Sequence, residues 1–182
     1  MRDLYLINLA RKFYKDGIKD EEFIMKAIES TLGGTCEKAT KKEDTKRHID
    51  FWWDSPKKGR IGIDAKGRKK NDRSDKKYND DIQWIEMYNI HGEKGWVYGD
   101  SEYVAFRTSE DIIFVKTEKL REFGEKVIEG KDTCYGRASK PKGFYAPYCR
   151  DGNKEVIFKC PTTDLIEMSS FIIDLDVIES DN

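Results

Sequence analysis

The chain has 182 residues, of which 37% are hydrophobic, 12% aromatic and 38% charged, and its formal net charge at pH 7 is −1. This aromatic content argues against a disordered chain, and the lack of a long apolar run argues against a membrane-spanning helix or a signal peptide. We therefore expect residues 1–182 to form a single cytoplasmic domain with no membrane partner.

Two helices are predicted at the start of the chain, within residues 1–35. Apolar residues recur at intervals of three to four over residues 4–14, which is the spacing of an amphipathic helix. A second helix is expected to begin at the acidic residues 20–22 and to end at the glycine pair 33–34. These helices precede the most informative part of the sequence.

A β-hairpin is predicted next. Two apolar, strand-like segments, 49–53 and 60–66, flank residues 54–59, which include Pro and Gly and are typical of a turn. Each segment carries one aspartate, Asp50 in the first and Asp64 in the second. A tight turn would bring these two carboxylates to similar heights on neighbouring strands.

The second strand also carries a lysine at Lys66, two residues after Asp64. Residues i and i+2 of a strand project from the same face, so the two side chains should point in one direction. Two carboxylates can hold a hard divalent cation through oxygen ligands, and an ammonium beside them can contact phosphate or water. The alternative is a solvated ion pair of little energetic weight.

The arrangement of Asp50, Asp64 and Lys66 resembles the PD-(D/E)XK nuclease superfamily, whose pattern is an acidic residue, a variable gap and then (D/E)-x-K. Ile49 stands where the superfamily name has Pro, a departure that many members share. Over roughly residues 36–122 the chain is similar to uncharacterised phage-type members. The stretches that extend the likeness beyond the hairpin are 39–44, 84–89 and 92–106.

The resemblance implies a mixed α/β (α+β) fold with a central mixed β-sheet flanked by helices and a restriction-endonuclease-like core at residues 36–128. It implies Mg²⁺ or Mn²⁺ as cofactor, with Asp50, Asp64 and the Ala65 backbone carbonyl as metal ligands and Lys66 as a catalytic residue. A third carboxylate is expected near the metal. The candidates for it are Glu22, Glu29 and Glu86, with solvated surface charge as the alternative for the first two.

Further strands and a helix are expected in the rest of the core. Residues 83–90 alternate in part and predict a third strand, with Glu86 on the same face as two aromatic residues. Glu86 is then either a hydrogen-bonded core group or a catalytic carboxylate. The segments expected to continue the sheet are 96–98, 103–106 and 112–115, followed by a helix over 117–128.

Basic residues are concentrated beside the Asp64 segment. Residues 57–77 contain ten Lys or Arg against three Asp, and residues 69–77 contain no apolar side chain and predict a solvated loop. The C-terminal part, 129–182, is expected to hold an irregular basic segment, a strand at 155–159 and an acidic tail. The residues predicted to contact nucleic acid are Arg68, Lys69, Lys70, Arg73, Arg137, Lys140 and Lys142. The alternatives are a plain solubilising loop and an irregular hairpin.

Together these features predict a metal-dependent endonuclease that hydrolyses DNA phosphodiester bonds, with RNA left open as a substrate and a homodimer left open as the assembly. The runner-up is a non-catalytic module on the same fold that binds nucleic acid or another protein. A third interpretation is a regulatory protein whose acidic C-terminal segment meets a basic partner. Because a fold does not fix an activity, the choice depends on the geometry of the site.

Overall fold

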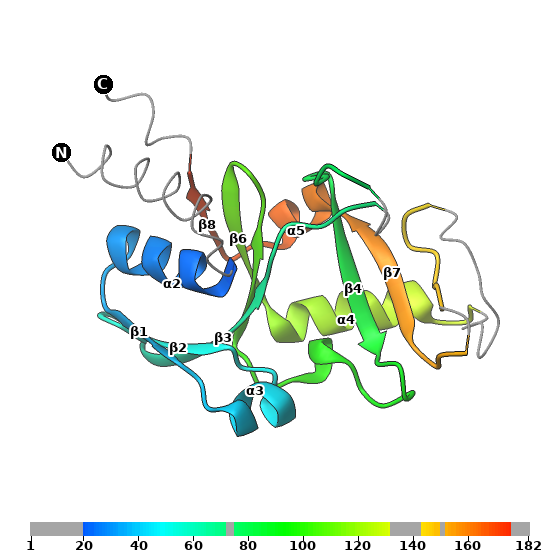
Figure 1. Cartoon of the computed structure of the whole chain (residues 1–182), viewed down its shortest axis with the longest axis horizontal. Coiled ribbons are helices and arrows are strands. Elements are labelled where there is room, and N and C mark those ends of the chain that lie inside the picture. Colours follow the sequence, from blue (N-terminus) through cyan, green and yellow to red (C-terminus); the bar gives the residue numbers. More distant parts are fainter. Residues whose placement is uncertain (1–19, 72–74, 132–142, 150–151, 176–182) are drawn as a thin grey trace.

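The computed structural model describes residues 20–71, 75–131, 143–149 and 152–175 (Figure 1). Within these ranges the chain is a mixture of helices and strands, which confirms the predicted mixed α/β class. The helices are α2 (Asp20–Thr31), α3 (Lys41–Arg47), α4 (Thr117–Ile128), α5 (Thr162–Met168) and the short 3-10 helix η1 (Trp96–Tyr98). The strands are β1 (Thr35–Lys38), β2 (Phe51–Ser55), β3 (Gly59–Lys66), β4 (Ile82–Tyr88), β5 (Tyr103–Arg107), β6 (Asp111–Lys116), β7 (Val156–Pro161) and β8 (Phe171–Asp174).

The strands form two separate sheets. Six strands make a mixed sheet in the order β1-β2-β3-β5-β6-β8, in which only the β3–β5 pair is parallel. Strands β4 and β7 pair antiparallel in a second, two-stranded sheet. Strand β4 confirms the strand predicted at residues 83–90, but it does not belong to the sheet that carries Asp64.

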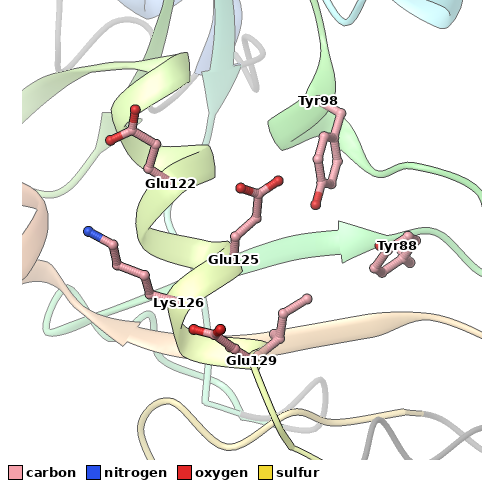
Figure 2. A pocket seen from close by; sticks show the side chains of 7 residues that line it. Tyr88, Tyr98, Glu122, Glu125, Lys126 and Glu129 are labelled. Carbon is pink, nitrogen blue, oxygen red and sulfur yellow. The ribbon is translucent and has the colours of Figure 1, made fainter.

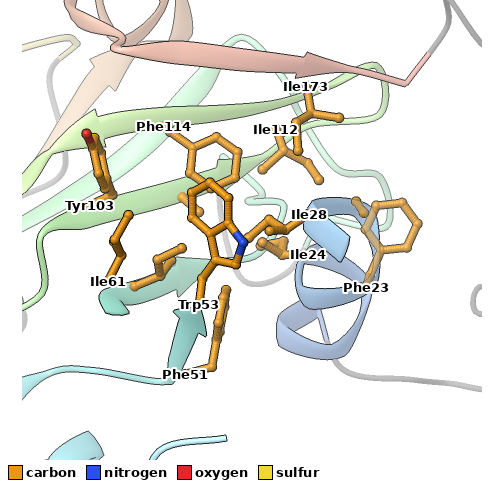
Figure 3. Close-up of a cluster of buried hydrophobic side chains, with 13 residues drawn as sticks. Phe23, Ile24, Ile28, Phe51, Trp53, Ile61, Tyr103, Ile112, Phe114 and Ile173 are labelled. Carbon is orange, nitrogen blue, oxygen red and sulfur yellow. The ribbon is translucent and has the colours of Figure 1, made fainter. Parts of the chain in front are cut away.

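One face of the six-stranded sheet packs against α2. The helix buries its Phe23, Ile24 and Ile28 side chains against residues that alternate along the strands, as expected when one face of a sheet is covered (Figure 3). Phe51 and Trp53 of β2 belong to this cluster. The remaining strand residues of this core are Ile61, Ile63, Tyr103, Ala105, Ile112, Phe114 and Ile173.

The opposite face of the six-stranded sheet packs against α4, η1 and the β4–β7 sheet. Val104, Phe106, Ile113 and Val115 project to this face, and all four are fully buried. Strands β4 and β7 both contribute buried side chains to this second core. Helix α4 lies alongside the two strands (Figure 1). The two faces of the large sheet therefore support two different hydrophobic cores.

Several predicted elements can be compared directly with the structure. The helix expected from residue 20 and the helix over 117–128 are confirmed, and the helix predicted at 4–14 lies outside the described residues. The strand predicted at 96–98 is wrong. This segment is a 3-10 helix, because the N–H groups of Tyr98 and Gly99 donate to carbonyls three residues earlier rather than to a neighbouring strand.

Helix α3 was not predicted, although its start has a clear local signal. Thr40 and Glu43 form a capping box, in which each side chain accepts a hydrogen bond from the other residue's backbone N–H. His48 ends the helix in the left-handed conformation, with φ of 52°. This helix delivers the chain directly to Asp50 and strand β2.

Among the described residues, no helix is both long enough and apolar enough to cross a bilayer.

Candidate functional site

The β2–β3 hairpin brings Asp50 and Asp64 together, as the spacing predicted. Phe51 pairs with Ile63, and the Asp50 N–H donates to the Ile63 carbonyl at 2.9 Å, so Asp50 lies beside the end of β3. The Asp50 Oδ2 atom accepts a hydrogen bond of 2.7 Å from the Ala65 N–H. The Asp50 carboxylate is thereby held against the strand that carries Asp64.

Asp64 is the most buried charged group of this site, with an exposed fraction of 1%. Its Oδ1 atom accepts a hydrogen bond of 2.5 Å from the Lys66 ammonium, whereas Oδ2 is buried without a hydrogen-bond partner among the described residues. Burial raises the pKa of Asp64 to about 7, the lysine opposes this rise, and the neighbouring Asp50 reinforces it. The described residues therefore donate a hydrogen bond to only one of the two oxygens of the ionised Asp64 carboxylate.

Lys66 is fixed between Asp64 and an aromatic ring. Its ammonium lies 4.6 Å from the centroid of the Trp96 ring, and only 18% of its side chain is exposed. Trp96 in turn packs its edge against Phe106 at a centroid distance of 6.1 Å. The ring of η1 thus orients the lysine through a cation–π contact. Sequence analysis missed this role of Trp96, because η1 reaches the site from 30 residues further along the chain.

His48 is a second residue at the site that sequence analysis did not single out. It is half-buried at the end of α3, and its pKa is lowered by burial and by the positive charge of Lys66, so the imidazole is neutral at pH 7. The carboxylates of Asp44, Asp50 and Asp100 act in the opposite direction on its pKa. Its position two residues before Asp50 was the available signal.

Lys69 is half-buried three residues after Lys66. Burial lowers the pKa of Lys69, the Lys66 charge lowers it further, and the Asp20 and Asp64 carboxylates raise it. Of the loop predicted at residues 69–77, the structure describes residues 69–71 and 75–77 and shows them without helix or strand, with Lys69 half-buried. The structure places this cation within electrostatic reach of Asp64, where it adds a second positive charge beside Lys66.

The three candidates for a third carboxylate do not join Asp50 and Asp64. Glu22 forms an ion pair with Lys38 at 2.6 Å, and the Glu29 carboxylate accepts a hydrogen bond from the Cys36 N–H at 2.7 Å. Glu86 belongs to β4 in the other sheet, with its backbone against Gly95. Within the described ranges, no group of three or more His, Cys, Asp or Glu side chains is arranged to hold a metal.

The basic residues predicted to contact nucleic acid fall into two groups. Arg68 and Lys70 both lie near the Tyr78 ring, at 5.0 Å and 5.6 Å from its centroid, and Arg68 also forms two hydrogen bonds with Asp80. These residues and Lys69 follow Lys66 directly along the chain. The other predicted residues, Arg73, Arg137, Lys140 and Lys142, lie outside the described residues.

The donor atoms at the site fit a hard divalent cation. Asp64 offers a buried oxygen without a partner, and Asp50 offers a second carboxylate beside it. Oxygen ligands of this kind suit Mg²⁺ or Mn²⁺, which also retain bound waters when few protein ligands are present. The direct contact between Lys66 and Asp64 would have to lengthen for both Asp64 oxygens to become ligands.

A separate hollow of about 670 Å³ lies between α4 and the Tyr88 end of β4 (Figure 2). Its lining carries three glutamates, Glu122, Glu125 and Glu129, and one lysine, Lys126, and the Glu125 side chain points towards Tyr98. Burial raises the pKa of Tyr98, and the nearby Tyr88 and Glu125 add to this effect. The negative charge of this hollow makes it an unsuitable site for a polyanion such as nucleic acid.

Comparison with known proteins adds no assignment to these observations. The chain matches no family model, no curated protein and no solved structure.

Proposed function

We propose that the protein is a metal-dependent nuclease of the PD-(D/E)XK type that hydrolyses phosphodiester bonds in DNA. The observation that carries this proposal is the convergence of Asp50, Asp64 and Lys66 at the end of the β2–β3 hairpin. One Asp64 oxygen there is buried and has no hydrogen-bond partner in the described part of the chain. A buried carboxylate beside a second, half-buried one is unfavourable unless a cation or a proton compensates the charge. A divalent metal ion would compensate this charge and would also activate water for hydrolysis.

In this proposal the three side chains have different roles. Asp50 and Asp64 hold Mg²⁺ or Mn²⁺, and the Ala65 carbonyl is the proposed third protein ligand. A bound divalent ion supplies Lewis-acid activation of water and of the phosphate. Lys66 orients the attacking water or stabilises the negative charge that develops on the phosphate, because Trp96 and Asp64 keep its ammonium in one place.

Cleavage assays test the proposal directly. Purified wild type, Asp64→Asn, Lys66→Ala and the control Lys57→Ala are incubated with supercoiled plasmid and with end-labelled single strands in magnesium, manganese or EDTA. Lys57 lies in the exposed turn of the same hairpin, away from the two aspartates. We expect metal-dependent cleavage that falls by about 10²-fold or more in the Asp64 and Lys66 variants and is unchanged in Lys57→Ala.

Folding of each variant is checked by circular dichroism and thermal unfolding. This check distinguishes a loss of activity at the site from a loss of the folded structure. Full activity in Asp64→Asn or in Lys66→Ala, with both folded, would rule out the proposed roles.

A second candidate function is a non-catalytic module that binds nucleic acid on the same scaffold. The observation that favours it is the closed Asp64–Lys66 ion pair, in which the lysine already compensates the buried carboxylate. This candidate predicts nucleic-acid binding without cleavage in any metal. The same assay, combined with a binding measurement in EDTA, separates the two functions.

A further inference from the structure

The β4–β7 sheet has two faces of different character. The side chains of Ile85, Met87 and Phe158 point inward to the core shared with α4. On the other face, Trp84 and Lys159 lie directly opposite each other across the two strands, and the Lys159 ammonium is 5.2 Å from the centroid of the Trp84 ring. Both side chains are only partly buried.

This outer face is continuous with the chain that leaves the Asp64–Lys66 site. The Trp84 indole N–H donates to the Lys70 carbonyl at 3.2 Å, and the Lys159 ammonium donates to Asn71 at 3.5 Å. Tyr148 packs against Trp84 with a centroid distance of 6.0 Å. We call this continuous strip the aromatic-basic surface. Its members are Arg68, Lys70, Tyr78, Trp84, Tyr148 and Lys159.

Two of the three cations of the aromatic-basic surface are suited to phosphate, whereas the third, Arg68, is paired with Asp80 at 2.7 Å. Neither Lys70 nor Lys159 forms an ion pair with any carboxylate of the described residues. The Tyr78 ring between Arg68 and Lys70 is 48% exposed. The acidic hollow beside α4 lies at the other end of β4, next to Tyr88. The carboxylates of this hollow would repel a polyanion.

We propose that the aromatic-basic surface binds an unpaired nucleic-acid strand and leads it to the Asp64–Lys66 site. This inference rests on the proposed nuclease function and adds the class of substrate. Partly exposed rings interleaved with lysines match a single strand, whose bases can stack on aromatic side chains while cations contact its phosphates. The base faces of a duplex are already stacked on one another and offer no such contact.

Binding is measured in EDTA, so that no strand is cut, by fluorescence anisotropy of a labelled single-stranded DNA and of its duplex over a range of salt concentrations. We expect wild type to prefer the single strand. Trp84→Leu should weaken single-strand binding by about tenfold, because stacking on one ring is lost. Lys159→Gln should weaken single-strand binding and reduce its salt dependence, because one phosphate contact is lost.

Matched controls come from the other end of the same region. Tyr88→Leu changes an aromatic residue of β4 that lines the acidic hollow, and Lys126→Gln removes a lysine charge there. Both should bind the single strand as wild type does. Equal binding of duplex and single strand by wild type, or wild-type affinity in Trp84→Leu and Lys159→Gln together, would overturn the proposed surface.

The two proposals fail in different ways. Absence of metal-dependent cleavage by a wild type that still binds single strands through Trp84 would reject the nuclease and keep the surface. Metal-dependent cleavage that depends on Lys66 but is insensitive to Trp84 and Lys159, in binding as well as in rate, would reject the surface and keep the nuclease. An RNA strand of the same sequence, tested beside the DNA, shows whether the 2′-hydroxyl affects binding.

Discussion

Asp64 combines deep burial, one short contact with Lys66 and one oxygen that accepts no hydrogen bond from the residues that the structure describes. Such a group stabilises the folded protein only when its charge is compensated, because removing a carboxylate from water is unfavourable. In the absence of metal the compensation is incomplete, and a proton is the remaining source of it. The stability of the metal-free protein should therefore depend on pH through this residue.

We predict that Asp64 makes a contribution to the free energy of unfolding in EDTA that decreases as pH rises from about 4 to about 7. The pKa of Asp64 is raised in the folded protein to about 7 from its ordinary value of 3.8, so folding favours the protonated acid. The stabilisation is complete below pH 4 and is lost as Asp64 ionises in the folded state. Asp64→Asn should remove most of this slope, as measured by urea unfolding at several pH values.

A matched control for this experiment is Asp54→Asn. Asp54 lies on the same hairpin, but its side chain is 47% exposed and pairs with Arg60 at the surface. Asp54→Asn should retain the wild-type dependence on pH. An Asp64→Asn variant whose stability still declines over this range as in wild type would show that another group is responsible.

At the level of single residues, the sequence predicted the meeting of Asp50, Asp64 and Lys66 because hairpin register and the two-residue period of a strand are local properties. It did not predict Trp96 or His48 at the site. Trp96 arrives through the packing of η1 on the large sheet, and such a contact between distant segments has no local pattern. His48 is brought to the site by a helix that was not predicted.

Among the elements, the junction between α2 and β1 depends on Gly34. This residue has a φ of +82°, and a Cβ there would lie 2.2 Å from the Asp54 carbonyl oxygen of the neighbouring β2. Only glycine allows both the left-handed backbone and this close approach. The junction sets the position of α2 over the face of the sheet that carries Phe51 and Trp53.

We predict that Gly34→Ala destabilises the protein substantially more than Gly59→Ala. Gly59 has a similar φ of +77° in the hairpin turn, but no atom lies within 4 Å of its would-be Cβ. Gly59→Ala should therefore show only the backbone effect of about 1–2 kcal/mol. Gly34→Ala should lose about 1–3 kcal/mol more, through the clash with β2.

Chemical denaturation of the two glycine variants beside wild type measures the difference. Equal losses of stability in both variants would mean that the backbone near Asp54 moves away from the new methyl group without a loss of free energy. The α2–β1 junction would then have more freedom than its geometry indicates.

The elements differ in how well they could be predicted. Helix α4 was predicted at its observed bounds, because its apolar residues follow the helical period and it begins after a buried strand. The pairing of β4 with β7 was not predicted, because the partners are separated by most of the second half of the chain. The period of β4 identifies a strand but contains no information about which sheet it joins.

For the molecule as a whole, metal binding should appear as a gain in thermal stability. A ligand that binds only the folded state at about tenfold excess over its dissociation constant adds about 1.4 kcal/mol, which corresponds to a rise in Tm of about 3–6 °C for a chain of this size. We predict such a rise on addition of magnesium or manganese to wild type. No comparable rise should occur in Asp64→Asn, as measured by differential scanning fluorimetry.

Calcium serves as a second probe in this measurement, since it binds oxygen ligands and commonly does not support the same chemistry as magnesium. Equal shifts in wild type and Asp64→Asn would place the bound ion elsewhere in the molecule.

The mixed topology of the large sheet also bears on the order in which the site is assembled during folding. The hairpin that joins Asp50 to the neighbourhood of Ala65 closes over 15 positions, whereas the parallel pairing of β3 with β5 joins residue 63 to residue 103. Short loops close at a smaller entropic cost than long ones, so local pairings are favoured early. The two mutually repelling aspartates are therefore brought together by the shorter of these two loops. The Trp96 ring that orients Lys66 lies within the longer loop and reaches the site only when that loop closes.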